Sequence, residues 1–475
     1  MILVGKMKRV EEDFLGKKEV PESSYYGIFT VRANETFKLS SQKVDLRIIY
    51  AGAMIKKAAA LANKDVGRLE KEKADAIVKA CDEVLLKKHD QEFILDAFQA
   101  GAGTPLHMNL NEVLANRATE FLGGKKGQYL VHPNNHVNMA QSSNNFTPTA
   151  IKLAAILEIR KKLIEEIKLL EKEFANKKQE YKKLIKCART HLQDAVPISF
   201  GQVFEAQEFA IKWDRKAIEQ SSTYLSYLGI GGNAVGTGIT AHPKFQKKLV
   251  EQLAKITKLD LEVSDSSVEA TQNMNSFLHL SGALRCYAIT LNRIANDLRL
   301  LASGPKTGFA EIILSAIEPG SSIMPGKVNP SVPEAINMCC FQVLGNDYTI
   351  SLACQSGQLE LNWMTPLIGY NLMQSIDLIT NATKLFREKC VAGLKVDEKR
   401  VKELFNQSFA YATSLNPYLG YSKVSKLVKE AYEKGVTLKQ LILDLKILTK
   451  EDLDKITSIT GPNEIDKEIL KRINY

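Results

Sequence analysis

Apolar residues recur along much of this 475-residue chain with the period of an α-helix. One stripe is formed by Ile156, Ile159, Leu163, Ile167, Leu170 and Phe174. Their spacings of three and four residues bring all of them to one helix face. The pattern continues without a helix breaker over residues 147–186. A helix of that length exceeds the globular norm and indicates a bundle or a coiled-coil-like core.

Three further segments, 200–226, 267–303 and 333–390, show the same periodicity. The last contains Pro366, which predicts a kink or a division into two helices. Four or five long helices with short links predict an all-α fold built around a long helix bundle.

The two ends of the chain differ from this pattern. The first 45 residues are less periodic and are predicted to be irregular or partly extended, and beyond about residue 395 short amphipathic segments alternate with turns. We therefore predict three domains: a mixed and helical one over residues 1–143, the central bundle over 144–394 and a small helical domain over 395–475.

The formal net charge is +10, which invites a nucleic-acid reading. The lysines of residues 161–186, however, are interleaved with glutamates, and we find no basic tract with aromatic residues. Solvated helix faces explain the charge better, and a positive field would also steer a dianion. We expect no nucleic-acid partner.

Seven cysteines without CxxC spacing indicate a reducing compartment. The apolar stretch within Met1–Lys8 is too short for a signal peptide, and no apolar run reaches transmembrane length. We expect a cytoplasmic protein without a membrane partner.

The segment Gly320–Pro330 lies between two helical runs and combines two glycines and two prolines with two hydroxyls, an amine and a carboxamide. Such a loop can move and can bring polar groups to a small ligand. A plain connector between bundle helices is an equally good interpretation of its composition.

Other polar turns are candidates of the same kind. Ala188–Pro197 carries a hydroxyl, an imidazole and a carboxylate within five residues and is predicted to close the first long helix. Gly101–Thr104 combines two glycines with a hydroxyl, and Gln141–Asn145 is rich in hydroxyls and amides. Ordinary helix caps explain each of these turns singly. The glycine-rich run Gly229–Gly238 does not match a dinucleotide fingerprint, and we see no strand–turn–helix unit around it.

Together these segments resemble the aspartase/fumarase superfamily over nearly the whole chain. Gly320–Pro330 agrees with the superfamily signature G-S-S-x-M-P-x-K-x-N-P at all eight fixed positions. Supporting matches follow in order: Gly101–Thr104, Met108–Glu112, Gln141–Asn144, Arg189–Pro197, Ala234–Gly238 and Gly345–Asp347. The resemblance implies an all-α, three-domain subunit in a homotetramer with a many-helix core, whose active sites each take segments from three subunits.

The resemblance also implies a reaction on a small dicarboxylate, such as aspartate or fumarate. A proton leaves the carbon next to one carboxylate, the neighbouring carbon expels a group, and fumarate forms. It implies Ser321 as the base, with His191 and Glu334 as catalytic partners. The implied substrate-binding residues are Thr104, Ser142, Ser143, Asn144, Thr190, Ser322, Lys327 and Asn329. No metal ion or organic cofactor is implied.

Within the superfamily the chain resembles aspartate ammonia-lyases more than class II fumarate hydratases, which remain the alternative. Ala102 and the segment Glu269–Asn273 are aspartase-like, whereas Ser142-Ser143 is the fumarase pair. Asn145, His107, Pro105 and Phe29 depart from the usual pattern close to the matched site residues. A non-catalytic homologue, as among lens crystallins, is a third hypothesis that the intact site residues oppose.

Overall fold

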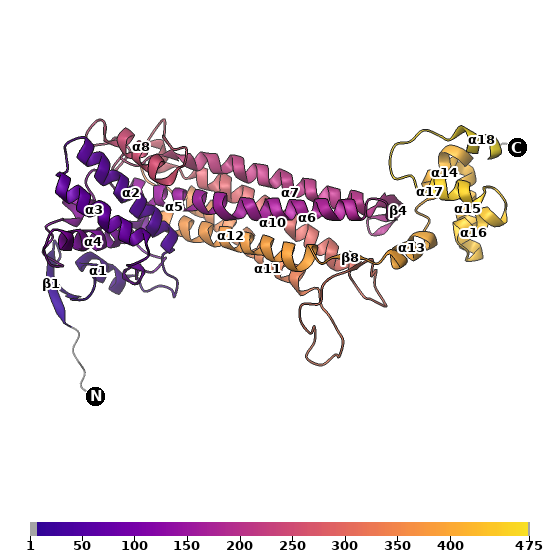
Figure 1. Cartoon of the computed structure of the whole chain (residues 1–475), viewed down its shortest axis with the longest axis horizontal. Coiled ribbons are helices and arrows are strands. Elements are labelled where there is room, and N and C mark those ends of the chain that lie inside the picture. The colour runs from indigo at the N-terminus through magenta and orange to yellow at the C-terminus, as the bar shows by residue number, and fades with distance from the viewer. Residues whose placement is uncertain (1–6, 474–475) are drawn as a thin grey trace. The chain divides into compact units, whose positions relative to one another are not determined.

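A computed structural model describes residues 7–473 and is predominantly helical (Figure 1), which confirms the predicted all-α class. The apolar stretch within Met1–Lys8 that was weighed as a signal peptide lies outside the described residues. The longest helices are α2 (Leu46–Asp65), α4 (Thr104–Phe121), α5 (Ser143–Glu158), α6 (Ile164–Glu180), α7 (Phe200–Thr223), α10 (Asn275–Leu301), α11 (Ser331–Gln355) and α12 (Thr365–Phe386).

Shorter helices complete the fold. They are α1 (Ile28–Thr36), α3 (Lys71–Leu85), α8 (Phe245–Thr257), α9 (Glu269–Gln272), α13 (Glu398–Gln407), α14 (Ala412–Leu419), α15 (Tyr421–Lys434), α16 (Leu438–Asp444), α17 (Lys450–Thr457) and α18 (Lys467–Ile473). The strands form four two-stranded sheets: β1 (Lys8–Asp13) with β2 (Gly16–Pro21), β3 (Ile185–Thr190) with β4 (Gln193–Ser199), β5 (Tyr227–Leu228) with β6 (Glu262–Val263), and β7 (Ile312–Ile313) with β8 (Lys395–Val396).

The chain divides into two compact units. The first consists of Met1–Glu165, Asp214–Ala288 and Cys340–Thr380, and the second of Glu166–Trp213, Ile289–Cys339 and Asn381–Tyr475. Each unit contains several non-adjacent stretches of sequence, because the long helices pass from one unit into the other. The three-domain division drawn from the sequence remains a prediction.

The first long helical segment follows its predicted apolar stripe. Every one of its six stripe residues, from Ile156 to Phe174, is fully buried. The helix is continuous from α5 to α6 through one π turn at Ile159–Leu163, where a single extra residue is accommodated. It ends at Glu180, so the predicted end at residue 186 was wrong.

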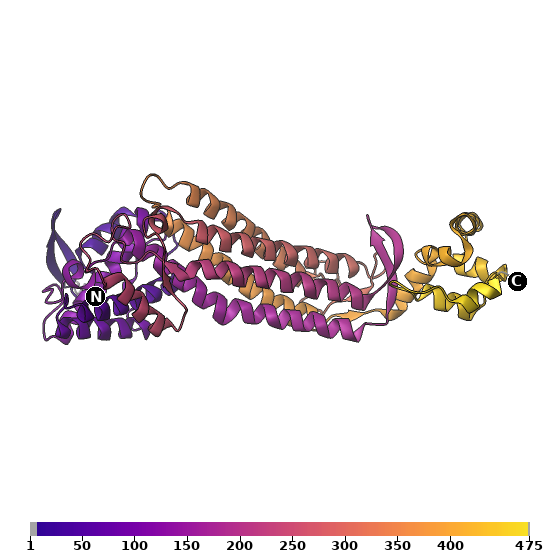
Figure 2. The same ribbon diagram turned by 90° about the horizontal axis from the view of Figure 1, so that it is seen from above.

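Helices α7, α10, α11 and α12 agree with the periodicity except at their breaks, and they run alongside one another in both views (Figure 1 and Figure 2). The predicted segment 267–303 is divided at Asn273, whose backbone is extended. The segment 333–390 is divided into α11 and α12. Pro366 lies in the first turn of α12, where its missing N–H costs no helical hydrogen bond.

The residues predicted to close the first long helix instead form a hairpin. Strands β3 and β4 pair in antiparallel register, with Thr190 opposite Gln193. The two-residue turn between them consists of His191 and Leu192, which both have positive φ angles of 56° and 59°. Two positive φ angles are the mark of a type I′ turn, which matches strand twist but normally selects Asn or Gly. Neither His191 nor Leu192 is a residue type from which such a turn would be predicted.

A buried ion cluster anchors this hairpin within the second unit. Glu311 is fully buried, 2.8 Å from Lys186 Nζ and 3.0 Å from Arg189 Nη1. Burial lowers the pKa of Lys186 below its ordinary value, because desolvation disfavours the ammonium form. One carboxylate thus joins two positions of β3 to the segment before β7, just ahead of the turn at His191.

The structure shows regular elements in two smaller regions where the sequence did not predict them. Residues predicted to be irregular or partly extended include the hairpin β1–β2 and helix α1. The glycine-rich run Gly229–Gly238 follows β5 and precedes α8 and the parallel strand β6, so our statement that no strand–turn–helix unit surrounds it was wrong. The strands of this unit, β5 and β6, are only two residues long.

The C-terminal helices enclose an apolar cluster of their own. Its buried members include Leu415, Leu427, Leu441, Leu453 and Ile469, one from each of α14 to α18. No helix among residues 7–473 is long and apolar enough to cross a membrane.

We predict that Glu311→Ala lowers the free energy of unfolding by about 3–5 kcal/mol, because it leaves the buried Lys186 and the partly buried Arg189 without their counter-charge. Urea unfolding followed by circular dichroism measures the change. Asp297→Ala is the matched control, since it removes the carboxylate of an ion pair with Arg293 whose side chains are half exposed. Equal effects of the two substitutions would contradict the anchoring role of Glu311.

Candidate active site

The first unit contains a cavity of about 570 Å³ that collects several predicted site residues. Its lining includes Thr104, Ser142 and Ser143, together with His107 and Phe29, two of the positions that depart from the family pattern. Three hydroxyls from two separate turns therefore converge on one space. Hydroxyl donors of this kind suit an anionic oxygen.

The hydroxyls of Ser142 and Ser143 are placed by the start of α5. Ser142 is the N-cap residue, and its Oγ accepts a hydrogen bond of 3.2 Å from the backbone N–H of Asn144. Serine and asparagine are favoured there because their short side chains satisfy free backbone groups. The carboxamide of Asn144 donates to Ala234 O at 2.7 Å, which joins this turn to the glycine-rich run.

Asn145, an unusual residue for the family, has a local explanation. Its side chain is buried and donates to Thr271 Oγ1 at 2.8 Å. The Thr271 hydroxyl already donates its proton to Ser267 O at 2.7 Å, so it can only accept from residue 145. An amide supplies that donor and a carboxylate does not.

Thr104 begins α4 directly after two residues in left-handed conformation, Ala102 and Gly103. A Cβ on Gly103 would approach the side chain of Thr147 to 2.7 Å, so glycine is required for both its φ of 70° and this close contact. Pro105 occupies the first turn of α4, a position that proline favours.

In the second unit the segment Gly320–Pro330 forms an irregular loop without helix or strand. The backbone N–H of Gly320 donates to Lys327 O at 2.8 Å, and the carboxamide of Asn329 donates to Gly320 O at 2.6 Å. A Cβ on Gly320 would come within 2.6 Å of Asn329 N, so only glycine closes the loop in this way. Ser322 and Lys327 are exposed.

Ser321 receives two backbone donors within this loop. Its Oγ accepts from the N–H of Met324 at 2.9 Å and from the N–H of Ile323 at 3.2 Å. Two N–H groups directed at one hydroxyl oxygen favour its deprotonated form. The side chain is half-buried and lines an opening of about 420 Å³ together with Lys327.

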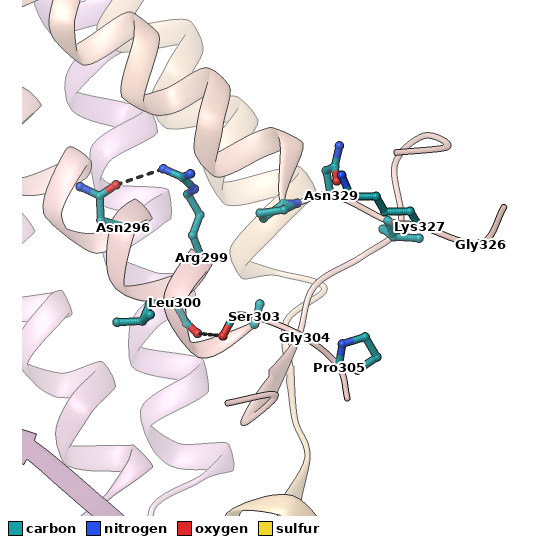
Figure 3. A pocket seen from close by; sticks show the side chains of 12 residues that line it. Asn296, Arg299, Leu300, Ser303, Gly304, Pro305, Gly326, Lys327 and Asn329 are labelled. Atoms are coloured by element: carbon teal, nitrogen blue, oxygen red, sulfur yellow. Dashed lines mark hydrogen bonds between the residues drawn. The ribbon is translucent and has the colours of Figure 1, made fainter. Parts of the chain in front are cut away.

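A larger cavity of about 680 Å³ lies against the same loop, also within the second unit. Figure 3 shows Arg299 from helix α10 on one side of it and Lys327 and Asn329 from the loop on the other. Arg299 donates to Asn337 Oδ1 at 3.0 Å, and its guanidinium is 3.8 Å from the carboxylate of Glu334. Two cationic side chains make this cavity suitable for a carboxylate.

Thr190 and His191 lie at the turn of the hairpin β3–β4, and both are exposed. The positive φ of His191 follows from its position in the two-residue turn of this hairpin. No hydrogen bond or ion pair joins Glu334 to His191 in the described part of one chain. The predicted orienting contact between them is therefore not made within a single subunit.

The predicted site residues are thus divided between the two units. Thr104, Ser142, Ser143 and Asn144 belong to the first, and the other seven belong to the second. Sequence reasoning missed Arg299, which is one of many scattered basic residues on a helix. It also missed the hydrogen bonds of His107, because their partners on other elements lie far away in sequence.

Metal-ligand chemistry has no obvious position in this arrangement. Within residues 7–473 no three His, Cys, Asp or Glu side chains form a group that could hold a metal ion.

Comparison with known proteins supports the family resemblance at both ends of the chain. A family model described as lyase matches residues 16–345, and one described as fumarase C C-terminus matches residues 412–460. The chain is 46% identical to an aspartate ammonia-lyase of Bacillus subtilis, with 98% of each chain covered. It is 42% identical to a class II fumarate hydratase of Photorhabdus laumondii, with 94% of this chain and 97% of the relative covered.

Among solved structures, a recombinant class II fumarase from Schistosoma mansoni superposes with a TM-score of 0.93 at 38% identity. The match covers 96% of this chain and all of that one. The fold, the loop signature and the matched relatives lead to one conclusion: the chain belongs to the lyase family of the aspartase/fumarase superfamily.

Proposed function

We propose that this lyase is an aspartate ammonia-lyase, which converts L-aspartate reversibly to fumarate and ammonia. The observation that carries the proposal is the loop Gly320–Pro330, in which two backbone N–H groups donate to Ser321 Oγ. The slightly higher identity to an aspartate ammonia-lyase than to a fumarate hydratase favours ammonia as the group expelled. Class II fumarate hydratase is the second candidate, and Ser142-Ser143 is the sequence feature that favours it.

In the proposed mechanism Ser321 acts as an alkoxide base. Its Oγ takes a proton from the carbon next to one carboxylate, so a C–H bond breaks and the serine O–H bond forms. The electron pair left on carbon spreads onto that carboxylate as an aci-carboxylate. The neighbouring C–N bond then breaks, the double bond of fumarate forms, and the nitrogen leaves with its bonding pair as ammonia. The two N–H groups on Ser321 lower the cost of the initial alkoxide.

The other site residues stabilise the charges that this reaction creates. Thr104, Ser142, Ser143 and Ser322 would donate to the carboxylate that becomes the aci-carboxylate, since hydroxyl donors gain most where negative charge develops. Lys327 and Asn329 would hold the second carboxylate, with Lys327 as a charge-assisted donor. Asn144, Thr190 and His191 would surround the leaving group, and Glu334 would orient His191.

We also infer a homotetramer with shared active sites. Neighbouring subunits would then provide contacts, such as that between Glu334 and His191, that a single chain does not make. Helix α11 exposes Met338, Phe341, Tyr348 and Leu352, with exposed fractions of 67%, 60%, 68% and 43%. With Gly345 between them, these positions follow a heptad spacing along one helix face. Large apolar side chains in such a stripe are typical of helices that pack against another copy of the chain.

The decisive experiment is a substrate comparison with the purified chain. We predict that absorbance from fumarate rises after addition of L-aspartate and does not rise after addition of L-malate. Rates on the two substrates at equal concentration measure the preference. A chain that forms fumarate from malate and not from aspartate is a fumarate hydratase.

We predict that Ser321→Ala lowers kcat by at least a thousandfold and changes the affinity for a dicarboxylate inhibitor by less than about threefold, because the base acts only in proton transfer. Steady-state kinetics and inhibitor titration measure the two effects. Ser315→Ala, a hydroxyl outside the signature loop, serves as the control. An unchanged kcat in Ser321→Ala would remove this residue from the mechanism.

Shared sites predict complementation between inactive variants. Ser143→Ala changes the first compact unit and Ser321→Ala the second. A site that takes these two serines from different subunits can therefore keep both of them intact in a mixed tetramer. If the two serines of one site come from different subunits, random assortment returns about a quarter of the wild-type activity. Activity is measured after the two variants are unfolded together and refolded, with each variant refolded alone as the control. No recovery in the mixture means that both serines of a site come from one chain.

A further inference from the structure

The hydroxyl of Ser143 is attached to a chain of buried polar groups that the proposed mechanism does not use. His107 Nδ1 is 2.9 Å from Ser143 Oγ, and His107 Nε2 is 2.6 Å from Lys56 Nζ. Lys56 and His107 are buried, with exposed fractions of 0% and 1%. The chain thus runs from α2 through α4 to the start of α5, inside the first unit.

Packing fixes these groups in place. The His107 ring is stacked on Phe146 with a centroid separation of 3.8 Å and an interplanar angle of 10°. Lys56 Nζ lies over the same Phe146 ring, 4.7 Å from its centroid. Gly52, one turn before Lys56, leaves the space that Phe146 fills, since a Cβ there would come within 2.8 Å of the ring. The imidazole therefore has little freedom to rotate away from Ser143.

The hydrogen-bond partners determine which nitrogen of His107 carries the proton. Burial lowers the pKa of His107 well below its ordinary value, so its ring is neutral near pH 7, with one donor and one acceptor. Lys56 donates to Asn138 Oδ1 at 2.9 Å, and the Asn138 amide nitrogen is committed to Gln141 O at 3.0 Å. Burial also lowers the pKa of Lys56 well below its ordinary value, but a neutral amine still has two protons, enough to donate to both Asn138 Oδ1 and His107 Nε2. When Lys56 donates to both, Nε2 is the acceptor.

The direction of the remaining bond follows. With Nε2 accepting, the proton lies on Nδ1 and is donated to Ser143 Oγ. Among residues 7–473, the Ser143 hydroxyl makes no second side-chain hydrogen bond. Its own proton is free to point into the cavity that Ser143 lines with Thr104 and Ser142. We propose that His107, held by Lys56, is a positioning residue that keeps Ser143 a hydrogen-bond donor to the substrate carboxylate.

This inference rests on the proposed function, because Ser143 must contact a substrate carboxylate for its orientation to affect the reaction. It adds a role for two residues that the family signature does not contain. It also explains the departure from the family pattern at His107. In the opposite tautomer Nδ1 would accept a hydrogen bond from Ser143 Oγ, and the serine proton would not be available to the substrate.

Two substitutions distinguish the hydrogen bond made by Nδ1 of His107 from the one made by Nε2. In His107→Asn the carboxamide reaches the position of Nδ1 and can still donate to Ser143. In His107→Gln it reaches the position of Nε2, where it accepts a hydrogen bond from Lys56 and makes none to Ser143. We predict that His107→Gln raises KM for aspartate about tenfold with a smaller change in kcat, and that His107→Asn raises KM less than threefold. His89→Gln is the control, because it alters another buried histidine of this unit that does not line the cavity.

A double-mutant cycle tests whether His107 acts through Ser143. The double variant His107→Gln/Ser143→Ala is expected to match Ser143→Ala in the affinity for succinate, a dicarboxylate inhibitor, within twofold. Additive effects, or equal effects of the Asn and Gln substitutions, overturn the proposal. Thermal unfolding of each variant is measured beside the kinetics.

The wild-type protein provides a test that needs no variant to be active. Solid-state NMR of protein labelled with 15N-histidine reports which ring nitrogen carries the proton, and the His107 signal is identified by its loss in whichever substitution folds. A protonated Nδ1 supports the proposal, and a protonated Nε2 with bare Nδ1 overturns it. A wild-type chain that forms fumarate from neither aspartate nor malate overturns the proposed function and this inference with it. An active wild type with an unaffected His107→Gln overturns this inference alone.

Discussion

The burial of apolar stripes along the long helices determines where polar chemistry can occur in this chain. Each helical turn of the segment from Ile156 to Phe174 contributes a fully buried side chain. Burial of a large apolar side chain stabilises the fold by about 1.5–3 kcal/mol. A hydroxyl or amide placed in such a stripe would cost free energy unless it were paired. The functional hydroxyls and amides are therefore confined to the ends of helices and the turns between them.

Helix ends also provide the hydrogen-bond donors that a carboxylate or an aci-carboxylate requires. At the start of α5 and in the loop Gly320–Pro330, backbone N–H groups have no helical acceptor and bind side-chain oxygens instead. Ser142 uses this arrangement as a helix cap, and Ser321 uses it to hold its oxygen between two donors. The same local physics thus yields a structural cap in one turn and a candidate base in the other.

Periodicity alone predicted the bundle well, because each stripe depends on residues that are neighbours in sequence. It failed where the decisive contact is distant. The hairpin β3–β4 replaces the predicted helix end, and Glu311, which binds Lys186 and Arg189 of this hairpin, lies far along the chain. The π turn at Ile159–Leu163 likewise leaves no clear mark in a spacing pattern, whereas Pro366 correctly predicted the division of the segment 333–390.

The loop signature identified Ser321, Lys327 and Asn329 as candidates directly from the sequence. Arg299 had no such signal, because a basic residue on an exposed helix face is common. Its proximity to Lys327 became visible only when α10 and the loop were seen lining one cavity. The hydrogen bond between Lys56 and His107 crosses from α2 to α4, so no local pattern could reveal it.

The departures from the family pattern fall into two physical kinds. Pro105 fits the first turn of α4, and Asn145 supplies the donor that Thr271 requires, so both follow from local backbone and packing. Neither lines the cavity of the first unit. Phe29 and His107 do line it, and His107 directs the hydroxyl of Ser143. A preference between ammonia and water as leaving group depends on differences of a few kcal/mol at the bound substrate. Phe29 and His107, which face the cavity, are therefore the departures best placed to supply such differences.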